Sequence, residues 1–356
     1  MGPGTQRRVA RALRAGGPEV IEVGFEDLPP LKKGEALVRV EAAGLNHAET
    51  LIRSGTYAVR LPFPYVLGGE GAGVVVATGP DVSLVVGARV CWGAVLGSCS
   101  TLVTAPASMF LPLPDGLSFE DGACLPVAGL TAGGLARVWP LKGHSAVVWG
   151  AAGAVGRMLV AILAEQGVDV IGIASGKRVD DARAAGANLV VDRANADVRE
   201  AVRAYTGGRG VAAVFDPIGT ATYETSLQLL APRGCLINYG ELSGPMPDIN
   251  LHALFPGSLF VTKFNGMRWV KGLDEFAVLI AEGLALAARR LAVISDVAGR
   301  FPLDCAADAY PDFRTSRQFP GGPQENSQCY QRGLWRKGLG EDLASCLTGG
   351  SLAFCC

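Results

Sequence analysis

The segment 145–166 constrains the fold more than any other part of this chain. Residues 145–156 read Ser-Ala-Val-Val-Trp-Gly-Ala-Ala-Gly-Ala-Val-Gly, and an apolar helical pattern continues to residue 166. A strand that enters a tight turn and then a helix is the geometry in which backbone N–H groups hold a pyrophosphate. Because Ala151 occupies the first glycine position of the GxGxxG pattern, an ordinary strand–helix turn remains an alternative on this motif alone.

A regular alternation surrounds this turn. Strand-like apolar runs at 146–149, 168–173, 189–191, 211–215 and 234–239 are separated by helical patterns at 155–166, 177–185, 195–205 and 222–231. A further helical pattern covers 272–287, and a strand-like run covers 291–297. Since strands that alternate with helices pair in parallel and carry helices on both faces, we predict a doubly wound parallel sheet.

The first third of the chain has a different pattern. Short apolar runs at 20–23, 36–40, 73–76, 89–92 and 100–103 are separated by Gly and Pro turns, which is typical of β-rich structure. A chain of 356 residues is long enough for two domains. The fold class is therefore α/β, with a β-rich domain before the parallel-sheet domain.

Composition argues against several classes of partner. The net charge is −1, so bulk charge favours neither nucleic acid nor an anionic membrane. We find no apolar run of the ~18 residues that span a bilayer, and residues 1–20 lack the long apolar segment of a secretory signal. The nine cysteines form no CxxC pair. This usage indicates thiols in a reducing compartment, and we expect a cytoplasmic protein.

The residues after the run 168–173 indicate which dinucleotide would bind. Ser175, Lys177 and Arg178 follow this run, and no Asp or Glu stands there to hold a ribose 2′-hydroxyl. A hydroxyl group and two cations suit a 2′-phosphate, which predicts NADPH. Arg193, after the next run, is a further candidate phosphate ligand. Alternatively, Lys177 and Arg178 begin a solvated helix and Arg193 is a surface residue.

Short motifs along the chain occur in an order and spacing that resemble a known family. They are Gly44-Leu45-Asn46-His47-Ala48-Glu49, Arg53-x-Gly55-x-Tyr57, Gly68-Gly69-Glu70-Gly71-x-Gly73, Leu130-Thr131-Ala132, Gly150-Ala-Ala-Gly153-x-Val155-Gly156, Thr206-Gly207-Gly208-x-Gly210-Val211, Asp216-x-x-Gly219 and Tyr239-Gly240-x-x-Ser243-Gly244. From about residue 8 to 313 the chain resembles the medium-chain dehydrogenase/reductase superfamily, specifically its zinc-independent quinone oxidoreductase branch.

This resemblance implies a domain organisation. A GroES-like catalytic domain would cover 1–125 and be completed by about 262–313, and a Rossmann NADP-binding domain would cover 126–261. The family also has a cleft between the two domains and is commonly homodimeric.

The resemblance further implies which residues contact the cofactor. Thr131 would lie near the nicotinamide, and residues 152–155 near the pyrophosphate. The predicted cofactor residues are Asn46, Thr131, Ala152, Gly153, Ala154, Val155, Ser175, Lys177, Arg178, Arg193, Pro217, Gly240, Glu241, Leu242, Ser243, Phe264 and Asn265. Of these, residues 240–243 would line the nicotinamide side. Phe264 and Asn265 would follow a strand that re-enters the catalytic domain.

The same comparison predicts that no metal is bound. Zinc-dependent members place Cys where this chain has Asn46 and His where it has Gly69. Glu70 alone cannot hold catalytic zinc, which needs three protein ligands, and Cys91 with Cys99 cannot form a four-cysteine site. Without a metal, a carbonyl or alcohol is not polarised by a Lewis acid.

Hydride transfer would then require an acceptor that is already electrophilic, a quinone or an α,β-unsaturated carbonyl, while the protein stabilises developing negative charge. We predict that Asn46, Tyr57 and Thr131 act on the reaction. Asn46 would donate an amide hydrogen bond and Tyr57 a phenolic one. The alternatives are a left-handed turn for Asn46 and simple loop packing for Tyr57. Glu70 would buttress a turn.

The end of the chain departs from the family pattern. Family members end with Gly-Lys and a terminal apolar strand, whereas residues 314–356 show no period of 2 or 3.6. We expect a poorly ordered tail that arose from a shifted reading frame or an altered terminus. The missing strand would leave a sheet edge exposed.

Three functions fit these observations. The first is an NADPH-dependent reductase of a small hydrophobic quinone, and the second is an enoyl or 2-alkenal reductase. The third is a cofactor-binding structural or regulatory protein with little turnover. The sequence hardly separates the first two, because both need the same metal-free site.

Overall fold

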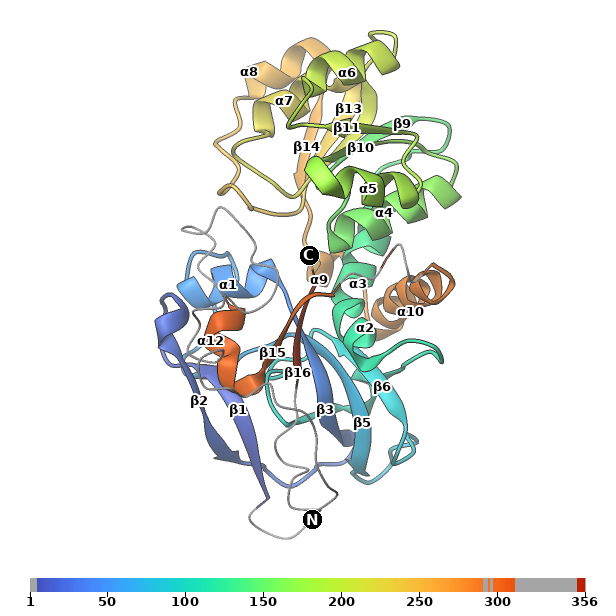
Figure 1. The fold of residues 1–356 in the computed structure, drawn as a ribbon. Helices are drawn as coiled ribbons and strands as arrows, with labels where there is room; N and C mark the ends of the chain where they lie inside the picture. The colour runs from blue at the N-terminus through green and yellow to red at the C-terminus, as the bar shows by residue number, and fades with distance from the viewer. Residues whose placement is uncertain (1–4, 291–293, 295–296, 311–350, 356) are drawn as a thin grey trace. The chain divides into compact units, whose positions relative to one another are not determined.

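The computed structural model describes residues 5–290, 294, 297–310 and 351–355, with the backbone alone for residues 177, 298 and 351–355 (Figure 1). The chain divides into two compact units. The first comprises residues 1–127 and 295–356, and the second comprises residues 128–294.

The first unit is rich in β-structure. Its strands are β1 (Gln6–Ala12), β2 (Ile21–Asp27), β3 (Glu35–Leu45), β4 (Tyr65–Val66), β5 (Glu70–Thr78), β6 (Arg89–Gly93), β7 (Leu102–Pro106), β8 (Leu111–Pro112), β15 (Val297–Pro302) and β16 (Ser351–Cys355). Its helices are α1 (His47–Ser54), α2 (Phe119–Cys124) and α12 (Ala306–Ala309), with 3-10 turns η1 (Pro18–Val20), η2 (Ala107–Met109) and η5 (Leu303–Cys305).

These strands form two sheets. One has the order β2-β1-β4, and the other has the order β15-β16-β3-β5-β6-β8, with β7 also paired to β3. The predicted runs 36–40, 73–76 and 89–92 lie in β3, β5 and β6. Fully buried side chains such as Val38, Val75, Val90 and Trp92 form the core of this unit.

The prediction that the terminal strand is missing is wrong. Strand β16 lies between β15 and β3; it pairs in parallel with β3, from Ser351 opposite Ala42 to Phe354 opposite Leu45, and antiparallel with β15. A strand with a neighbour on each side is held mainly by backbone hydrogen bonds, so it can form without an alternating apolar and polar pattern. The preceding part of the predicted tail, 314–350, lies outside the described residues.

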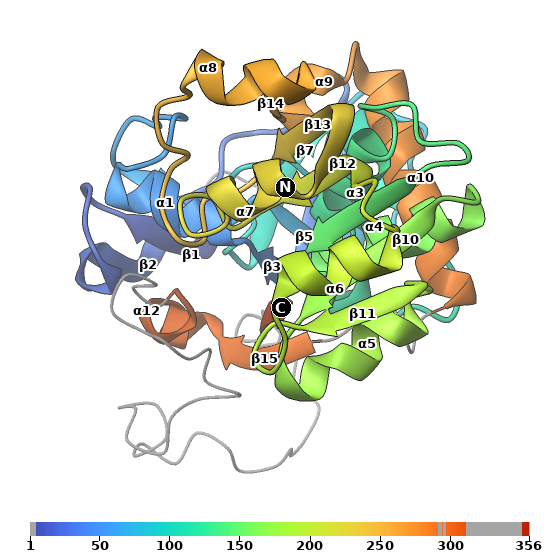
Figure 2. The same ribbon diagram turned by 90° about the horizontal axis from the view of Figure 1, so that it is seen from above.

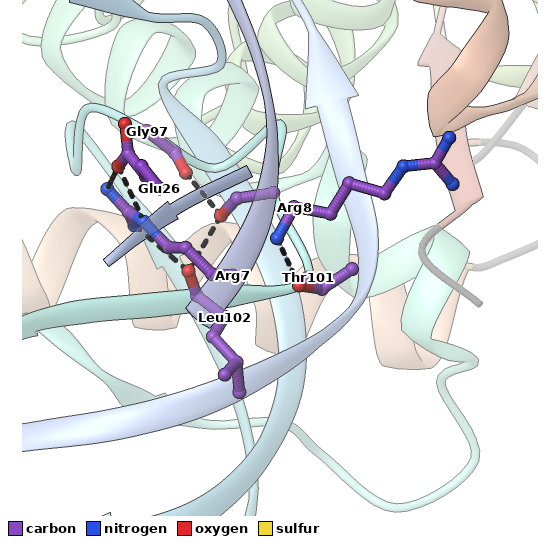
Figure 3. Close-up of polar contacts among 7 residues, drawn as sticks. Arg7, Arg8, Glu26, Gly97, Thr101 and Leu102 are labelled. Carbon is purple, nitrogen blue, oxygen red and sulfur yellow. Dashed lines mark hydrogen bonds and ion pairs between the residues drawn. The ribbon is translucent and has the colours of Figure 1, made fainter. Parts of the chain in front are cut away.

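Polar contacts fix β1 to the segment 97–102 (Figure 3). The Arg7 guanidinium donates to the Leu102 carbonyl at 2.9 Å and pairs with the Glu26 carboxylate at 2.6 Å, while the backbone N–H of Arg8 donates to Thr101 Oγ1 at 3.0 Å. This attachment holds the fully buried Cys99, which lies within the segment, in the core of the first unit.

The second unit contains the parallel sheet. Its strands are β9 (Ser145–Trp149), β10 (Asp169–Ala174), β11 (Leu189–Asp192), β12 (Val211–Asp216), β13 (Leu230–Asn238) and β14 (Phe260–Lys263). Its helices are α3 (Pro126–Leu135), α4 (Ala154–Glu165), α5 (Val179–Ala184), α6 (Val198–Tyr205), α7 (Tyr223–Gln228), α8 (Leu251–Leu254), α9 (Gly266–Trp269) and α10 (Leu273–Arg289), with 3-10 turns η3 (Gly176–Arg178) and η4 (Phe255–Gly257).

The doubly wound parallel sheet is confirmed. The strand order is β11-β10-β9-β12-β13-β14, and every neighbouring pair is parallel. Helices α4 and α5 pack against β10, and α7 packs against β13 (Figures 1 and 2). The order reverses between β9 and β12, and ligands of such sheets bind beyond the carboxyl ends of the strands at this point.

The second unit extends further along the chain than the predicted domain 126–261. Strand β14, which precedes Phe264, pairs with β13 as the sixth strand of this sheet and does not re-enter the first unit. Helix α10 also belongs here, because it packs closely on α3: a Cβ at Gly283 would lie 2.6 Å from Gly129 Cα. The chain returns to the first unit at Ser295.

The cysteines of the described residues differ in their bonding. Cys91, Cys99 and Cys235 are free thiols, whereas Cys124 and Cys305 are disulfide-bonded, so the expectation that the cysteines are thiols is wrong for these two. Among the described residues, no helix has both the length and the apolar character needed to cross a membrane.

Candidate functional site

The turn between β9 and α4 has the features of an anion-binding loop. Gly150 has φ of +63°, and a Cβ at Gly156 would lie 2.0 Å from the Gly150 carbonyl oxygen, so this close approach requires glycine. Gly153 is the N-cap residue of α4, and it has no side chain that could accept hydrogen bonds from the first N–H groups of the helix. Among the described residues, the N–H groups of 154–156 in the first turn of α4 have no acceptor, and such groups fit a diphosphate.

Basic and hydroxyl side chains gather beside this turn. Arg193 Nε donates to Ser175 Oγ at 2.8 Å, and Arg178 Nη2 donates to the Ala152 carbonyl at 2.6 Å. The contact from Arg178 joins the turn after β10 to the turn after β9. The structure thus brings together Ala152, Ser175, Arg178 and Arg193, while the side chain of Lys177 lies outside the described residues. Their charge and geometry fit a phosphate group on the ribose.

Sequence reasoning missed an acid at this place. Asp192, at the end of β11, accepts hydrogen bonds from the backbone N–H groups of Gly176 (3.2 Å) and Ala194 (3.0 Å) and from Asn195 Nδ2 (2.8 Å). These hydrogen bonds hold the pKa of the Asp192 carboxyl below its usual range, and the one from Ala194 has the largest effect. The carboxylate shapes the turn that carries Ser175, and it ends β11 rather than β10, where an acid that binds a ribose is expected.

A buried aspartate organises the loops after β12 and β13. Asp216 is fully buried; Oδ1 accepts from the N–H groups of Ile218 (2.7 Å) and Gly219 (3.1 Å), and Oδ2 accepts from Thr222 Oγ1 (2.7 Å) and Ser226 Oγ (2.9 Å). Asn238 Nδ2 donates to the carbonyls of Asp216 and Gly240, at 3.0 and 2.9 Å. The two loops therefore have one fixed shape.

The predicted residues of the nicotinamide side lie in these loops. A Cβ at Gly240 would lie 2.6 Å from the Pro217 carbonyl oxygen, and Leu242 N donates back to that oxygen at 3.1 Å. Ser243 Oγ donates to the Ile218 carbonyl at 2.8 Å. Leu242 is 47% exposed, whereas the half-buried Glu241 pairs with Lys263.

Three further predicted residues lie in the second unit. Phe264 follows β14, packs on Gly134 of α3 and donates its N–H to the Asn238 carbonyl at 2.8 Å. Asn265 is exposed and caps α9 by accepting from Arg268 N at 3.3 Å. Thr131 is half-buried on α3, and its hydroxyl makes no hydrogen bond to any residue that the structure describes.

In the first unit, Asn46 is the centre of a polar network. It precedes α1 with φ of −110° and ψ of 142°, so the left-handed alternative is wrong. Nδ2 donates to Glu70 Oε1 at 2.7 Å and to Glu49 Oε1 at 3.4 Å. Because both amide hydrogens are directed at carboxylates, the group that Asn46 can offer a ligand is its carbonyl oxygen, an acceptor.

Two carboxyl groups accept hydrogen bonds from the amide nitrogen of Asn46. Glu70 Oε2 accepts from Val127 N at 2.8 Å at the beginning of α3, so Glu70 does buttress the backbone as expected. Burial raises the pKa of Glu70 to about 8, although hydrogen bonds from Val127 and Asn46 act in the opposite direction. Burial also raises the pKa of Glu49, and the hydrogen bond from Tyr310 lowers it in part.

Tyr310 connects this network to the carboxyl-terminal part of the unit. Its hydroxyl donates to Glu49 Oε2 at 2.6 Å and lies 3.3 Å from Cys99 Sγ, and its carbonyl accepts from the buried Arg53 at 3.0 Å. Tyr310 is 1% exposed. Sequence reasoning assigned no role to Glu49 or Tyr310, which are 261 residues apart.

Tyr57 lies close in sequence to the network residues Asn46, Glu49 and Arg53. It is half-buried in the turn after α1, and its N–H donates to the Leu51 carbonyl at 3.1 Å. Its role on a ligand remains a prediction.

Comparison with known proteins agrees with this architecture. The model of the alcohol dehydrogenase GroES-like domain matches residues 32–148, and that of the zinc-binding dehydrogenase matches residues 154–281. A quinone oxidoreductase of Pseudomonas aeruginosa is 38% identical over 256 residues, which cover 70% of this chain and 78% of that protein. This chain belongs to the quinone oxidoreductase family. It falls in the zinc-independent branch of the medium-chain dehydrogenase/reductase superfamily.

Two other relatives bear on the chemistry. The structure of Escherichia coli quinone oxidoreductase complexed with NADPH has a TM-score of 0.78 and 29% identity, and the match covers 98% of this chain and 99% of that one. A 2-haloacrylate reductase of Burkholderia sp. is 32% identical over 295 residues, 78% of this chain and 86% of that protein.

The residues present do not fit the zinc that the name of one matching model implies. Asn46 uses its amide nitrogen on Glu70, and Gly69 has no side chain. Within the described part of the chain, no three His, Cys, Asp or Glu side chains gather as a metal site would require.

Proposed function

We propose that this protein is an NADPH-dependent reductase of quinones that works without a metal. The observation that carries the proposal is the pairing of the glycine turn before α4 with the Ser175–Arg193 contact beside it, in a member of the quinone oxidoreductase family. Helical N–H groups suit the pyrophosphate, and the guanidinium groups suit a 2′-phosphate.

The second unit would hold the nucleotide. Residues 152–155 contact the pyrophosphate, and Ser175, Lys177, Arg178 and Arg193 contact the 2′-phosphate. Pro217 and residues 240–243 position the nicotinamide end, because Asp216 and Asn238 fix their loops. Thr131, Phe264 and Asn265 complete this side. When bound, NADPH supplies the hydride.

The first unit would contribute Asn46 and Tyr57. Because Glu49 and Glu70 hold the amide nitrogen, Asn46 orients a hydroxyl of the nucleotide or substrate through its carbonyl oxygen. This assignment revises the predicted donor role. Tyr57 would donate its phenolic hydrogen to the acceptor oxygen as negative charge develops there.

Fluorescence titration with NADPH and NADH tests the nucleotide assignment. We expect NADPH to bind more tightly, and we expect Arg193→Ala to weaken NADPH binding while leaving NADH binding nearly unchanged. Arg183→Ala, an exposed change on α5, is the matched control. Equal affinities of the wild-type protein for both nucleotides would contradict the 2′-phosphate assignment.

The acceptor is tested by NADPH oxidation with 1,4-benzoquinone and with crotonaldehyde. Faster turnover of the quinone supports the proposal. Faster turnover of crotonaldehyde favours the second candidate, reduction of an activated C=C bond, which the likeness to a 2-haloacrylate reductase supports. Tight NADPH binding with no turnover of either compound would favour a structural or regulatory protein.

We further propose a homodimer and a cytoplasmic location. Strand β14 is the outer strand of its sheet, and exposed apolar side chains lie on it and on the preceding helices: Leu251 is 75% exposed, Phe255 84% and Phe260 51%. A second copy would pair with this edge and cover these side chains. Light scattering of Phe260→Asp should show a monomer, whereas Val85→Asp, in the first unit, should stay dimeric. Subcellular fractionation tests the location.

A further inference from the structure

A basic cavity lies in the second unit on the side away from the nucleotide turn. It has a volume of about 460 Å³ and is bounded by α6, the loop 206–210 and the segment 228–232. These elements stand at the beginnings of β12 and β13, whereas the glycine turn follows the end of β9. In a parallel sheet, the amino ends and the carboxyl ends of the strands lie on opposite sides of the sheet, so the cavity is separate from the proposed cofactor site.

The charge of the cavity lining is unbalanced. Arg199, Arg203 and Arg209 line it together with a single acid, Glu200. Arg199 donates to Gln228 Oε1 at 3.1 Å and lies 3.6 Å from the Asp197 carboxylate.

The other two guanidinium groups belong to exposed residues. Arg203 and Arg209 make no ion pair or side-chain hydrogen bond within the described part of the chain. Arg199 and Arg203 stand four residues apart on one face of α6, where like charges destabilise a helix. An anion in the cavity would remove this repulsion.

The loop that carries Arg209 is built to a fixed shape. Thr206 Oγ1 donates to the Val202 carbonyl at 2.8 Å and accepts from Gly210 N at 3.3 Å. Gly208 and Gly210 have φ of +78° and +75°, and a Cβ at Gly210 would lie 2.7 Å from Ala231 N. The glycines of this motif therefore let the loop press against the beginning of β13, with Arg209 at the rim.

The lining also has an apolar part. Leu230 is half-buried and Pro232 is exposed, and these two side chains supply its accessible apolar surface; Val202 and Leu229 are 1% and 3% exposed and are almost fully buried. The volume falls in the range of small-molecule sites, about 300–1,000 Å³, which combine an apolar lining with a few placed polar groups. Inorganic phosphate would satisfy the guanidinium groups but would leave the apolar part uncovered.

We propose that this cavity binds a small organic anion, with a phosphate or a pair of carboxylates on Arg203 and Arg209 and an apolar body on Leu230 and Pro232. Guanidinium groups suit both anions, because each can accept two parallel hydrogen bonds. Gln228 and Glu200 would contact polar groups of the same ligand.

Calorimetric titration of the full chain, saturated with NADPH, tests this site. The probes are phenyl phosphate, phthalate, inorganic phosphate and benzyl alcohol. We expect phenyl phosphate or phthalate to bind more tightly than inorganic phosphate, and benzyl alcohol not to bind. The tighter of the two organic anions identifies the anionic group that the site prefers.

Matched variants locate the binding. The double variant Arg203→Gln/Arg209→Gln should bind the organic anion about tenfold more weakly, or weaker still. Arg14→Gln, an exposed change in the first unit, should leave this affinity unchanged. Circular dichroism verifies that the double variant is folded. Unchanged affinity in the double variant, or no binding of either organic anion to the wild-type protein, would overturn the proposal. The double variant leaves Ser175 and Arg193 intact, so binding at the nucleotide turn would persist in it and is distinguishable.

Discussion

Replacement of Glu70 by Gln should change how the stability of the first unit depends on pH. Glu70 is 2% exposed, and burial raises its pKa from the ordinary 4.5 to about 8. Between these values the native state keeps a proton that the unfolded chain releases. The free energy of unfolding of the wild-type protein therefore falls as pH rises through this window.

The size of this effect follows from the pKa difference. Each pH unit within the window changes the free energy of unfolding by at most ~1.4 kcal/mol. Between pH 5 and pH 8 the wild-type unit should lose up to about 4 kcal/mol from this group. Glu70→Gln removes the titration. It adds a constant cost of about 1–3 kcal/mol, because one amide N–H then faces the donor of Asn46 or Val127.

The assay is urea-induced unfolding at several pH values, followed by pulsed hydrogen exchange on peptides of β3 and β5, which report on the first unit. We expect the free energy of unfolding to depend less steeply on pH in Glu70→Gln than in the wild-type protein. The wild-type dependence should persist in Asp115→Asn, which removes an exposed carboxyl group of the same unit. Some slope should remain in Glu70→Gln, since burial also raises the pKa of Glu49. Equal slopes in the wild-type protein and Glu70→Gln would refute the reasoning.

Three further predictions concern stability and binding. Tyr310→Phe should lower the free energy of unfolding by about 1.5–3 kcal/mol, because it removes a hydrogen bond to a buried carboxylate. Tyr65→Phe should leave the free energy of unfolding unchanged, since the buried Tyr65 hydroxyl has no partner among the described residues. Equal losses of stability in the two variants, measured by urea titration, would contradict the prediction for Tyr310→Phe. Gly156→Ala should weaken NADPH binding at least about tenfold, because its Cβ would lie 2.0 Å from a carbonyl oxygen, whereas Gly153→Ala, with 3.3 Å, should have a smaller effect in fluorescence titration. Deletion of 351–356 should destabilise the first unit by at least about 2 kcal/mol, because β16 bonds to two strands, and unchanged hydrogen exchange in β3 would exclude that.

The order of elements in the second unit could be predicted because each depends on local pattern. Apolar runs of three to six residues between helical patterns predicted five strands of the sheet, and the glycine turn predicted the beginning of α4. The sixth strand, β14, was assigned to the wrong unit. A short run does not encode which sheet it joins, because that choice depends on the neighbouring edge, here β13.

The site could be predicted where it depends on residue type and only partly where it depends on distant contacts. Ser175 and Arg193 were candidates separately, and the structure brings them to 2.8 Å. Asp192 and Asp216 were missed as organising groups, because a carboxylate that accepts backbone hydrogen bonds has no sequence signature beyond an acid near a turn.

The sequence by itself determined the class of fold, the glycine turn before α4 and the absence of zinc ligands at Asn46 and Gly69, since periodicity and residue type are local properties. Tertiary structure alone decided that β16 fills the gap between β15 and β3, and that Tyr310 holds Glu49 and through it Asn46. The pairing of β16 with β3 and the contact of Tyr310 with Glu49 each join residues more than 250 positions apart. Such contacts form because folding must satisfy buried polar groups and unpaired strands with whatever part of the chain reaches them.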